Sequence, residues 1–202
     1  MKSIEKELSV RVKADRRPKW LRHLCTVHHH RALVRKYCFK LGLYRQGLMH
    51  DLSKYSPTEF FVGAKYYQGY RSPNTAERLD RGYSTAWLHH KGRNKHHFEY
   101  WVDYSLEDKE HVINGAKMPR KYVAEMVMDR ISASKNYLGD DAYTDSAPYE
   151  YFMKNKDRLW FIHKETSRDL EALLHMLADK GEEKTLAYIK HVYLKKGPKK
   201  RK

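Results

Sequence analysis

Apolar residues recur at helical spacing along most of the chain, and no segment alternates apolar and polar residues long enough to predict a strand. Ser56-Pro57-Thr58-Glu59 forms a capping box with proline at the first helical position, which predicts a helix start there. The pattern predicts an all-α fold. Helices are expected at about 20–41, 43–52, 57–68, 72–90, 119–138, 156–180 and 182–196, with irregular connections at 91–95 and 103–118.

Composition is typical of a folded globular protein. The chain has 202 residues, of which 41% are hydrophobic and 33% charged, enough to bury a core. No segment approaches the roughly 20 apolar residues of a membrane span, and the charged N-terminus is unlike a signal peptide. Two cysteines, Cys25 and Cys38, fit neither a disulfide framework nor a zinc ribbon, so we expect a cytoplasmic protein with no membrane partner.

Basic residues give the chain a formal net charge of +16 and gather near both ends. We interpret residues 1–18 as a basic N-terminal extension, 19–194 as a single all-α domain and 195–202 as a basic, disordered tail. A positive surface attracts anions, so we expect a small anionic substrate. Nucleic acid is an alternative partner through the basic surface and tail. A well-solvated surface without an anionic partner is the other interpretation.

The first histidine cluster is the triplet His28-His29-His30. At about 100° per residue, His30 lies in the same arc as apolar neighbours, whereas His28 and His29 fall outside it. The neighbours in that arc are Val27, Val34, Cys38 and Leu41. We therefore expect His30 to face inward, as a metal ligand or as a core histidine with hydrogen-bonded nitrogens.

Asp129 passes the same helical-face test. It shares its face with the mostly apolar residues Tyr122, Met126, Ala133 and Tyr137. Burying an ionised carboxylate without a partner costs several kcal/mol, so Asp129 needs a cation. A metal ion is the favoured cation, and a salt bridge to another helix is the alternative.

His50 and Asp51 are adjacent, so an imidazole and a carboxylate can bind one ion together or two ions side by side. Helix capping by Asp51 is the alternative interpretation. Lys54, three residues later, lies on the same side of a helix. It is positioned to neutralise Asp51 or to contact an anionic substrate.

Residues 87–101 contain two further histidine pairs among aromatic residues. The five-residue connection between the pairs includes a glycine, so the segment can fold back on itself. We expect His90 and His97 to face inward as ligands. His89 and His96 are then expected to orient a ligand or contact substrate. Arg93, in the same segment, is a candidate to stabilise charge on a phosphoryl group.

In these residues the chain resembles the HD-domain superfamily, whose pattern is a helix-borne His, then His-Asp, then a later Asp on another helix. The matches are His30, His50-Asp51 and Asp129, and His50-Asp51-Leu52-Ser53-Lys54 is similar to the His-Asp-x-x-Lys variant of dinuclear members. The segments 47–60 and 87–101 look like a family of small bacterial and phage proteins of unassigned function. One departure is that the additional histidines lie close together in a loop-rich segment.

The resemblance implies an HD-like helical bundle with a central metal site of one or two divalent transition-metal ions (Fe, Mn, Co or Zn) and no organic cofactor. The implied ligands are His30, His50, Asp51, His90, His97 and Asp129, and the candidate catalytic residues are Lys54, Asp51 and Arg93. The leading hypothesis is a hydrolase of nucleotides or phosphoesters that uses a metal-activated water. The alternatives are a mixed-valence di-iron oxygenase acting on a small molecule, and a nucleic-acid or partner-binding protein with a structural metal.

Overall fold

A computed structural model describes residues 15–106, 111–139 and 141–195. Most of these residues are helical, so the predicted all-α class is confirmed. The α-helices are α2 (Lys19–Lys40), α3 (Tyr44–Met49), α4 (Pro57–Tyr66), α5 (Pro73–Arg81), α6 (Thr85–Lys91), α7 (Arg120–Leu138), α8 (Ala147–Asn155) and α9 (Lys164–Tyr188). Three 3-10 turns occur at Leu52–Tyr55, Phe98–Trp101 and Lys156–Arg158, and a π-helical turn, Ile189–Tyr193, follows α9.

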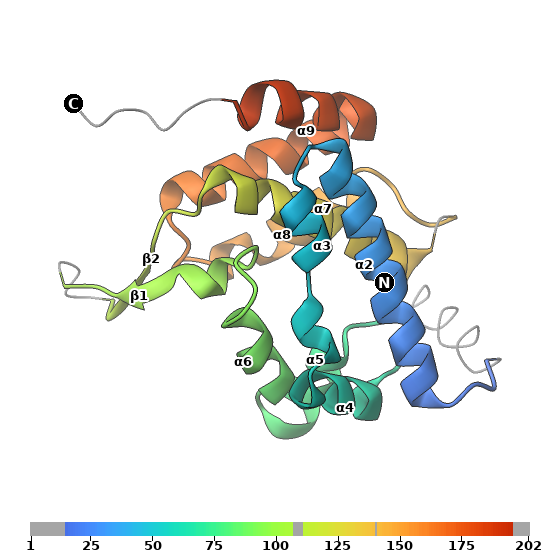
Figure 1. Cartoon of the computed structure of the whole chain (residues 1–202). Helices are drawn as coiled ribbons and strands as arrows, with labels where there is room; N and C mark the ends of the chain where they lie inside the picture. The colour runs from blue at the N-terminus through green and yellow to red at the C-terminus, as the bar shows by residue number, and fades with distance from the viewer. Residues whose placement is uncertain (1–14, 107–110, 140, 196–202) are drawn as a thin grey trace.

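The core lies around α7, which is buried along every residue from Val123 to Met128. Helix α2 packs against α3, α4 and α7, while α9 packs against α7 and α8. In Figure 1, α4, α5 and α6 gather at one end of the molecule and α9 lies at the opposite end. The chain between α3 and α4 crosses the middle, beside α2, and brings residues 50–55 to the centre of the fold.

Most helices begin and end near the residues predicted from the sequence, with three differences. The segment 72–90 forms two helices, because Gly82 adopts φ +81° and ends α5. The segment 43–52 is helical only to Met49, before the turn that carries Asp51. The helix expected from 156 begins at Lys164, and its predicted break at Gly181 is confirmed by the non-helical φ +81° and ψ +171° of that residue.

Three elements were not predicted from the sequence. Strands β1 (Val102–Tyr104) and β2 (Ile113–Gly115) form an antiparallel pair inside the segment expected to be irregular. A side chain at Gly115 would overlap the backbone at Phe161, so the glycine permits the hairpin to lie against that segment. Helix α8 was also missed, although Ser146 and Pro148 mark its start.

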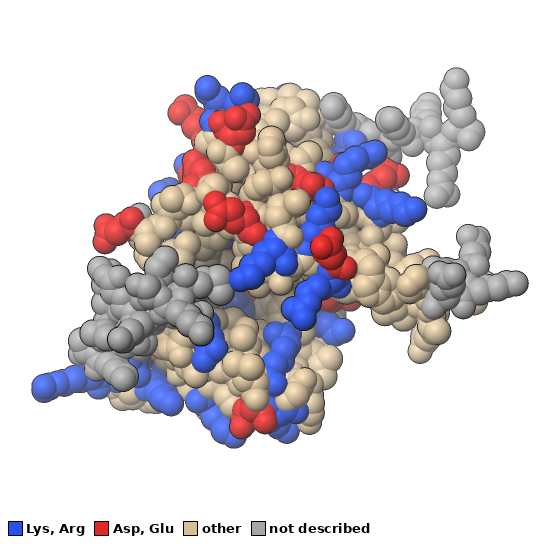
Figure 2. Space-filling view, turned by 180° about the vertical axis from the view of Figure 1, so that it is seen from behind, with Lys and Arg blue, Asp and Glu red and all other residues tan. Residues whose placement is uncertain are grey.

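The predicted basic extension (1–18) and tail (195–202) lie largely outside the described residues, which exclude 1–14 and 196–202. The single-domain interpretation of 19–194 stays a prediction. Within the described ranges, no helix is long and apolar enough to cross a membrane. On the face shown in Figure 2, Lys and Arg side chains are spread over much of the surface with acidic groups between them.

Candidate metal centre

The His50-Asp51 pair sits in a turn rather than within a helix. Helix α3 ends at Met49, and Asp51 has φ +53° and ψ +26°, in the left-handed region that aspartate enters more readily than most residues. Arg31 fixes this turn by donating hydrogen bonds to the carbonyls of Leu48 (3.1 Å) and His50 (2.8 Å). His50 and Asp51 are each only 1% exposed, so the turn holds both side chains inside the protein.

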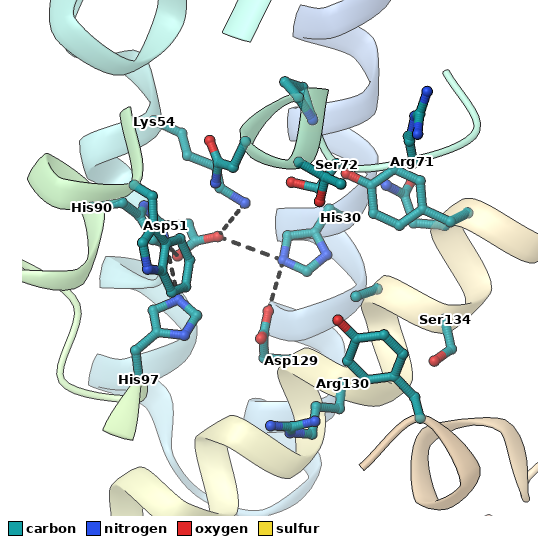
Figure 3. A pocket seen from close by; sticks show the side chains of 18 of the residues that line it. His30, Asp51, Lys54, Arg71, Ser72, His90, His97, Asp129, Arg130 and Ser134 are labelled. Atoms are coloured by element: carbon teal, nitrogen blue, oxygen red, sulfur yellow. Dashed lines mark hydrogen bonds and ion pairs between the residues drawn. The ribbon is translucent and has the colours of Figure 1, made fainter. Parts of the chain in front are cut away.

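One group of donor atoms joins this turn to α2 and α7. His30 Nε2 lies 3.5 Å from Asp51 Oδ2 and 3.0 Å from Asp129 Oδ1, and His50 Nε2 lies 3.5 Å from each of the same oxygens. Figure 3 shows His30 between Asp51 and Asp129. The sequence expectation for these four residues is therefore matched by their placement, and two imidazoles and two carboxylates converge on one point.

A second group lies on the other side of Asp51. His90 Nε2 and His96 Nε2 lie 3.3 Å and 3.4 Å from Asp51 Oδ1, and His97 Nε2 lies 2.9 Å from His90 Nε2. Asp51 thus contributes one oxygen to each group. His96, expected from the sequence to orient a ligand or contact substrate, is 2% exposed and belongs to the donor cluster itself.

The donor set fits divalent transition-metal ions. Oδ1 of Asp51 and Nε2 of His96 are buried with no hydrogen-bond partner among the described residues. The Nε2 atoms of His30 and His50 face each other at 3.4 Å. Buried polar atoms left this way cost free energy unless another group satisfies them. Mixed imidazole and carboxylate ligands suit Fe, Mn, Co and Zn, so these buried clusters can hold a metal ion.

Two buried glutamates contact the Nδ1 atoms of the histidines, on the far side of each ring from the donor Nε2. Neither was predicted from the sequence as part of the site. Glu125 Oε1 lies 2.9 Å from His50 Nδ1 and 3.2 Å from His96 Nδ1. A carboxylate on the remote nitrogen of a metal-binding histidine fixes its orientation and its tautomer. Glu125 precedes Asp129 by four residues, so the helical spacing already placed it on the same face.

Glu59 has the same role for the other histidines. Its two oxygens lie 2.6 Å from His89 Nδ1 and 2.7 Å from His90 Nδ1. Its backbone N–H donates to Ser56 Oγ, as the capping box predicts, while its side chain turns to the histidines. His89 is therefore held away from the donor cluster, by the same carboxylate that orients His90.

The Asp51 carboxylate and the Lys54 ammonium stabilise each other's charged form. Burial raises the pKa of Asp51, but nearby His50 and Lys54 lower it by more, so its net pKa lies well below the usual range. For Lys54, burial lowers the pKa, but the Asp51 carboxylate, whose Oδ2 lies 2.7 Å from Nζ, raises it by more together with Tyr137 and Asp129. Both groups are therefore held in their charged forms, with Lys54 as a fixed cation beside the cluster.

A cavity of about 760 Å³ opens beside the first donor group. Its wall includes Lys54, Asp129, Arg130 and several aromatic side chains, some of which appear in Figure 3. Arg93, a candidate catalytic residue by sequence, is not part of this wall. It is exposed, and its guanidinium donates to the carbonyl of His89. The structure therefore does not bring Arg93 into the donor cluster, and its catalytic role stays a prediction from the sequence.

Comparison with known proteins gives a family and no activity. A family model described as a family of unknown function, DUF5662, matches residues 19–176, which is most of the chain. The chain therefore belongs to that family. No curated protein and no solved structure matches it. The matched range contains every residue of the donor cluster.

Proposed function

We propose that this member of the DUF5662 family is a metal-dependent hydrolase of the HD type that acts on a phosphorylated small molecule. The observation that carries the proposal is the position of Asp51. Its two buried oxygens face two separate groups of imidazoles, and the Lys54 ammonium lies against one of those oxygens. A carboxylate shared between two ions, next to a fixed cation, is an arrangement suited to phosphoryl chemistry.

In this proposal His30, His50, Asp51 and Asp129 hold one ion, and Asp51, His90, His96 and His97 hold a second. A bound divalent ion would supply an acidified water and would polarise a phosphoryl oxygen. The protein contributes the rigid placement of the ligands. Asp51 is fixed by its turn. Glu125 holds the Nδ1 atoms of His50 and His96, and Glu59 holds that of His90.

The positive charges that line the cavity favour an anionic substrate. Lys54 presents a permanent positive charge at its inner end, and Arg71, Arg78, Arg130 and Arg158 also line its wall. Lys54 is only partly exposed, so its charge is poorly screened by water. We assign to Lys54 the stabilisation of negative charge that develops on the substrate during hydrolysis.

The test is hydrolysis by protein loaded with Mn²⁺, Co²⁺ or Fe²⁺, using a panel of nucleotides, cyclic nucleotides and simple phosphoesters. We expect metal-dependent release of phosphate or alcohol from at least one compound. His50→Ala should abolish it, and Lys54→Met should lower kcat by about 10²–10³-fold with little change in metal content. The matched control is His28→Ala, because His28 is exposed on the same helix turn as His30. A panel left untouched by all three metal forms would contradict the proposal.

A di-iron oxygenase is the second candidate, and the number of imidazoles favours it. Five histidines surround Asp51, which is a nitrogen-rich set for two hydrolytic ions and suits iron well. Protein purified without added metal distinguishes the two candidates. Two irons per chain with consumption of O₂ in the presence of a substrate would favour the oxygenase, and metal-dependent hydrolysis without O₂ would exclude it as the main activity.

A further inference from the structure

Arg130 is a partly buried cation with which no carboxylate of the described residues forms an ion pair. It follows Asp129 on α7, and Figure 3 shows it on the cavity wall near Asp129. Its Nε is buried without a hydrogen-bond partner in the part of the chain that the structure describes. Its neighbour on one side is the Phe152 ring, with the guanidinium carbon 5.7 Å from the ring centroid.

A guanidinium group withdrawn from water without a paired anion is costly, by up to several kcal/mol even after relaxation. A contact with an aromatic ring recovers only part of that cost. Two acidic residues of the same wall, Asp129 and Glu99, act on its charge, but neither forms an ion pair with it among the described residues. Asp129 contacts His30 and His50 instead, and Glu99 Oε2 is itself buried without a hydrogen-bond partner in the described ranges. Arg130 Nε and Glu99 Oε2 therefore both lack a polar partner, which a bound ligand would supply.

The other arginines of the cavity differ from Arg130. Arg71 donates to Gln68 and to the hydroxyl of Tyr70, and Arg78 packs over the Trp87 ring at 5.4 Å. Arg158 is exposed to solvent. Among these four, Arg130 alone has a buried donor atom without a partner in the described residues. A bound anion should therefore interact most favourably with Arg130.

The cavity is large enough for more than a phosphate ion. Its volume of about 760 Å³ lies within the range of pockets for organic ligands. Trp87, Tyr137, Tyr151 and Phe152 contribute aromatic surface to the same wall, which suits the carbon body of such a ligand. Asp51, Lys54 and Arg130 all line this one cavity.

We propose that the substrate carries two anionic groups. The first lies at the donor cluster beside Lys54, and the second, a carboxylate or a phosphate remote from the reacting bond, pairs with the guanidinium of Arg130. The placement of the first group rests on the proposed function. The pairing with Arg130 rests only on the burial of its unpartnered donor.

The experiment measures binding of ω-phosphonocarboxylates with one to five methylene groups to Mn²⁺-loaded protein by calorimetry. Each is compared with the alkylphosphonate of the same length, which lacks the carboxylate. For at least one length we expect the carboxylate to tighten binding about tenfold or more. Arg130→Met should remove that gain, so that each phosphonocarboxylate binds no more tightly than its alkylphosphonate counterpart. Arg45→Met is the control, since Arg45 is exposed on α3 and does not line the cavity.

Thermal unfolding without ligand provides a second readout. Replacing an unpaired, partly buried cation with methionine should leave the melting temperature unchanged or raise it. If Arg130 instead neutralises Glu99, Arg130→Met will lower the melting temperature and leave ligand binding intact, which overturns the proposal. The proposal is also overturned if the carboxylate tightens binding at no chain length. If the carboxylate tightens binding through Arg130 but no metal-dependent hydrolysis is found, the proposed activity is rejected and the anion site is retained.

Discussion

Glu125 connects the two donor groups through a single carboxylate oxygen. That oxygen contacts Nδ1 of His50, which belongs to the first group, and Nδ1 of His96, which belongs to the second. Burial raises the pKa of Glu125, but the hydrogen bonds and the charges of the two histidines together lower it by more, so its pKa is below the usual value. Glu125 therefore orients two ligands at once and keeps their Nε2 atoms directed toward Asp51.

Glu125→Gln should weaken metal binding, although the glutamine side chain has nearly the same size as that of glutamate. The neutral amide polarises both imidazoles less, and such changes behind a ligand cost about 10–100-fold in metal affinity. Competition with a chelator measures the affinity for each ion. Glu165→Gln is the control, because Glu165 is exposed in a surface ion pair with Lys117. Equal affinities in the wild type and in Glu125→Gln would show that the glutamate does not act on the ligands.

At the scale of the elements, the site is assembled from three helices and two connections. Helix α2 carries His30 and α7 carries Asp129, and these helices pack directly against each other. Helix α6 carries His90, while the turn after α3 and the segment after α6 bring in the other donors. Two glycines of the fold, Gly92 at the end of α6 and Gly181 within α9, differ in backbone conformation.

Gly181→Ala should destabilise the protein, whereas Gly92→Ala should not. Gly181 has φ +81° and ψ +171°, a region open almost only to glycine, so alanine costs about 1–3 kcal/mol in the free energy of unfolding. Gly92 has φ −75° and ψ −10°, which alanine adopts readily, and an added methyl there meets only ordinary contacts. Urea unfolding of metal-free protein measures both changes. A Gly181→Ala variant as stable as the wild type would contradict the assigned backbone conformation.

For the whole molecule, metal binding and folding are expected to be coupled. The donor residues come from positions 30 to 129 and meet only in the folded chain. An ion that binds the folded state alone stabilises it by about 2.7 kcal/mol at 100 times its dissociation constant. For a chain of this size, that corresponds to a rise in melting temperature of roughly 5–10 °C.

Addition of Mn²⁺, Co²⁺ or Zn²⁺ to chelator-treated protein should therefore raise the melting temperature, and a chelator should reverse the rise. His50→Ala should remove most of it, since that ligand is lost from the first group. Ca²⁺ serves as the control ion, because it prefers oxygen ligands and should give little shift with this imidazole-rich set. A rise of the same size with Ca²⁺, or in His50→Ala, would place metal binding elsewhere on the protein.

The sequence by itself determined the helical class, most helix positions and the inward direction of His30 and Asp129. Each of these follows from the regular 100° spacing of side chains around one helix, which is a local property. His28 and His29 are exposed and His30 is buried, as that spacing predicts. Gly181 and the capping box at Ser56 marked helix ends for a similar local reason.

Only the tertiary structure decided which residues of the loop segment join the cluster. His96 enters it and Arg93 points away, because residues after α6 follow turns without a helical period. The contacts of Glu125 and Glu59 with histidines 29 or more residues away, and the burial of the Arg130 Nε without a partner, depend on how helices pack. Spacing along a helix fixes the direction of a side chain, but only packing fixes what it meets.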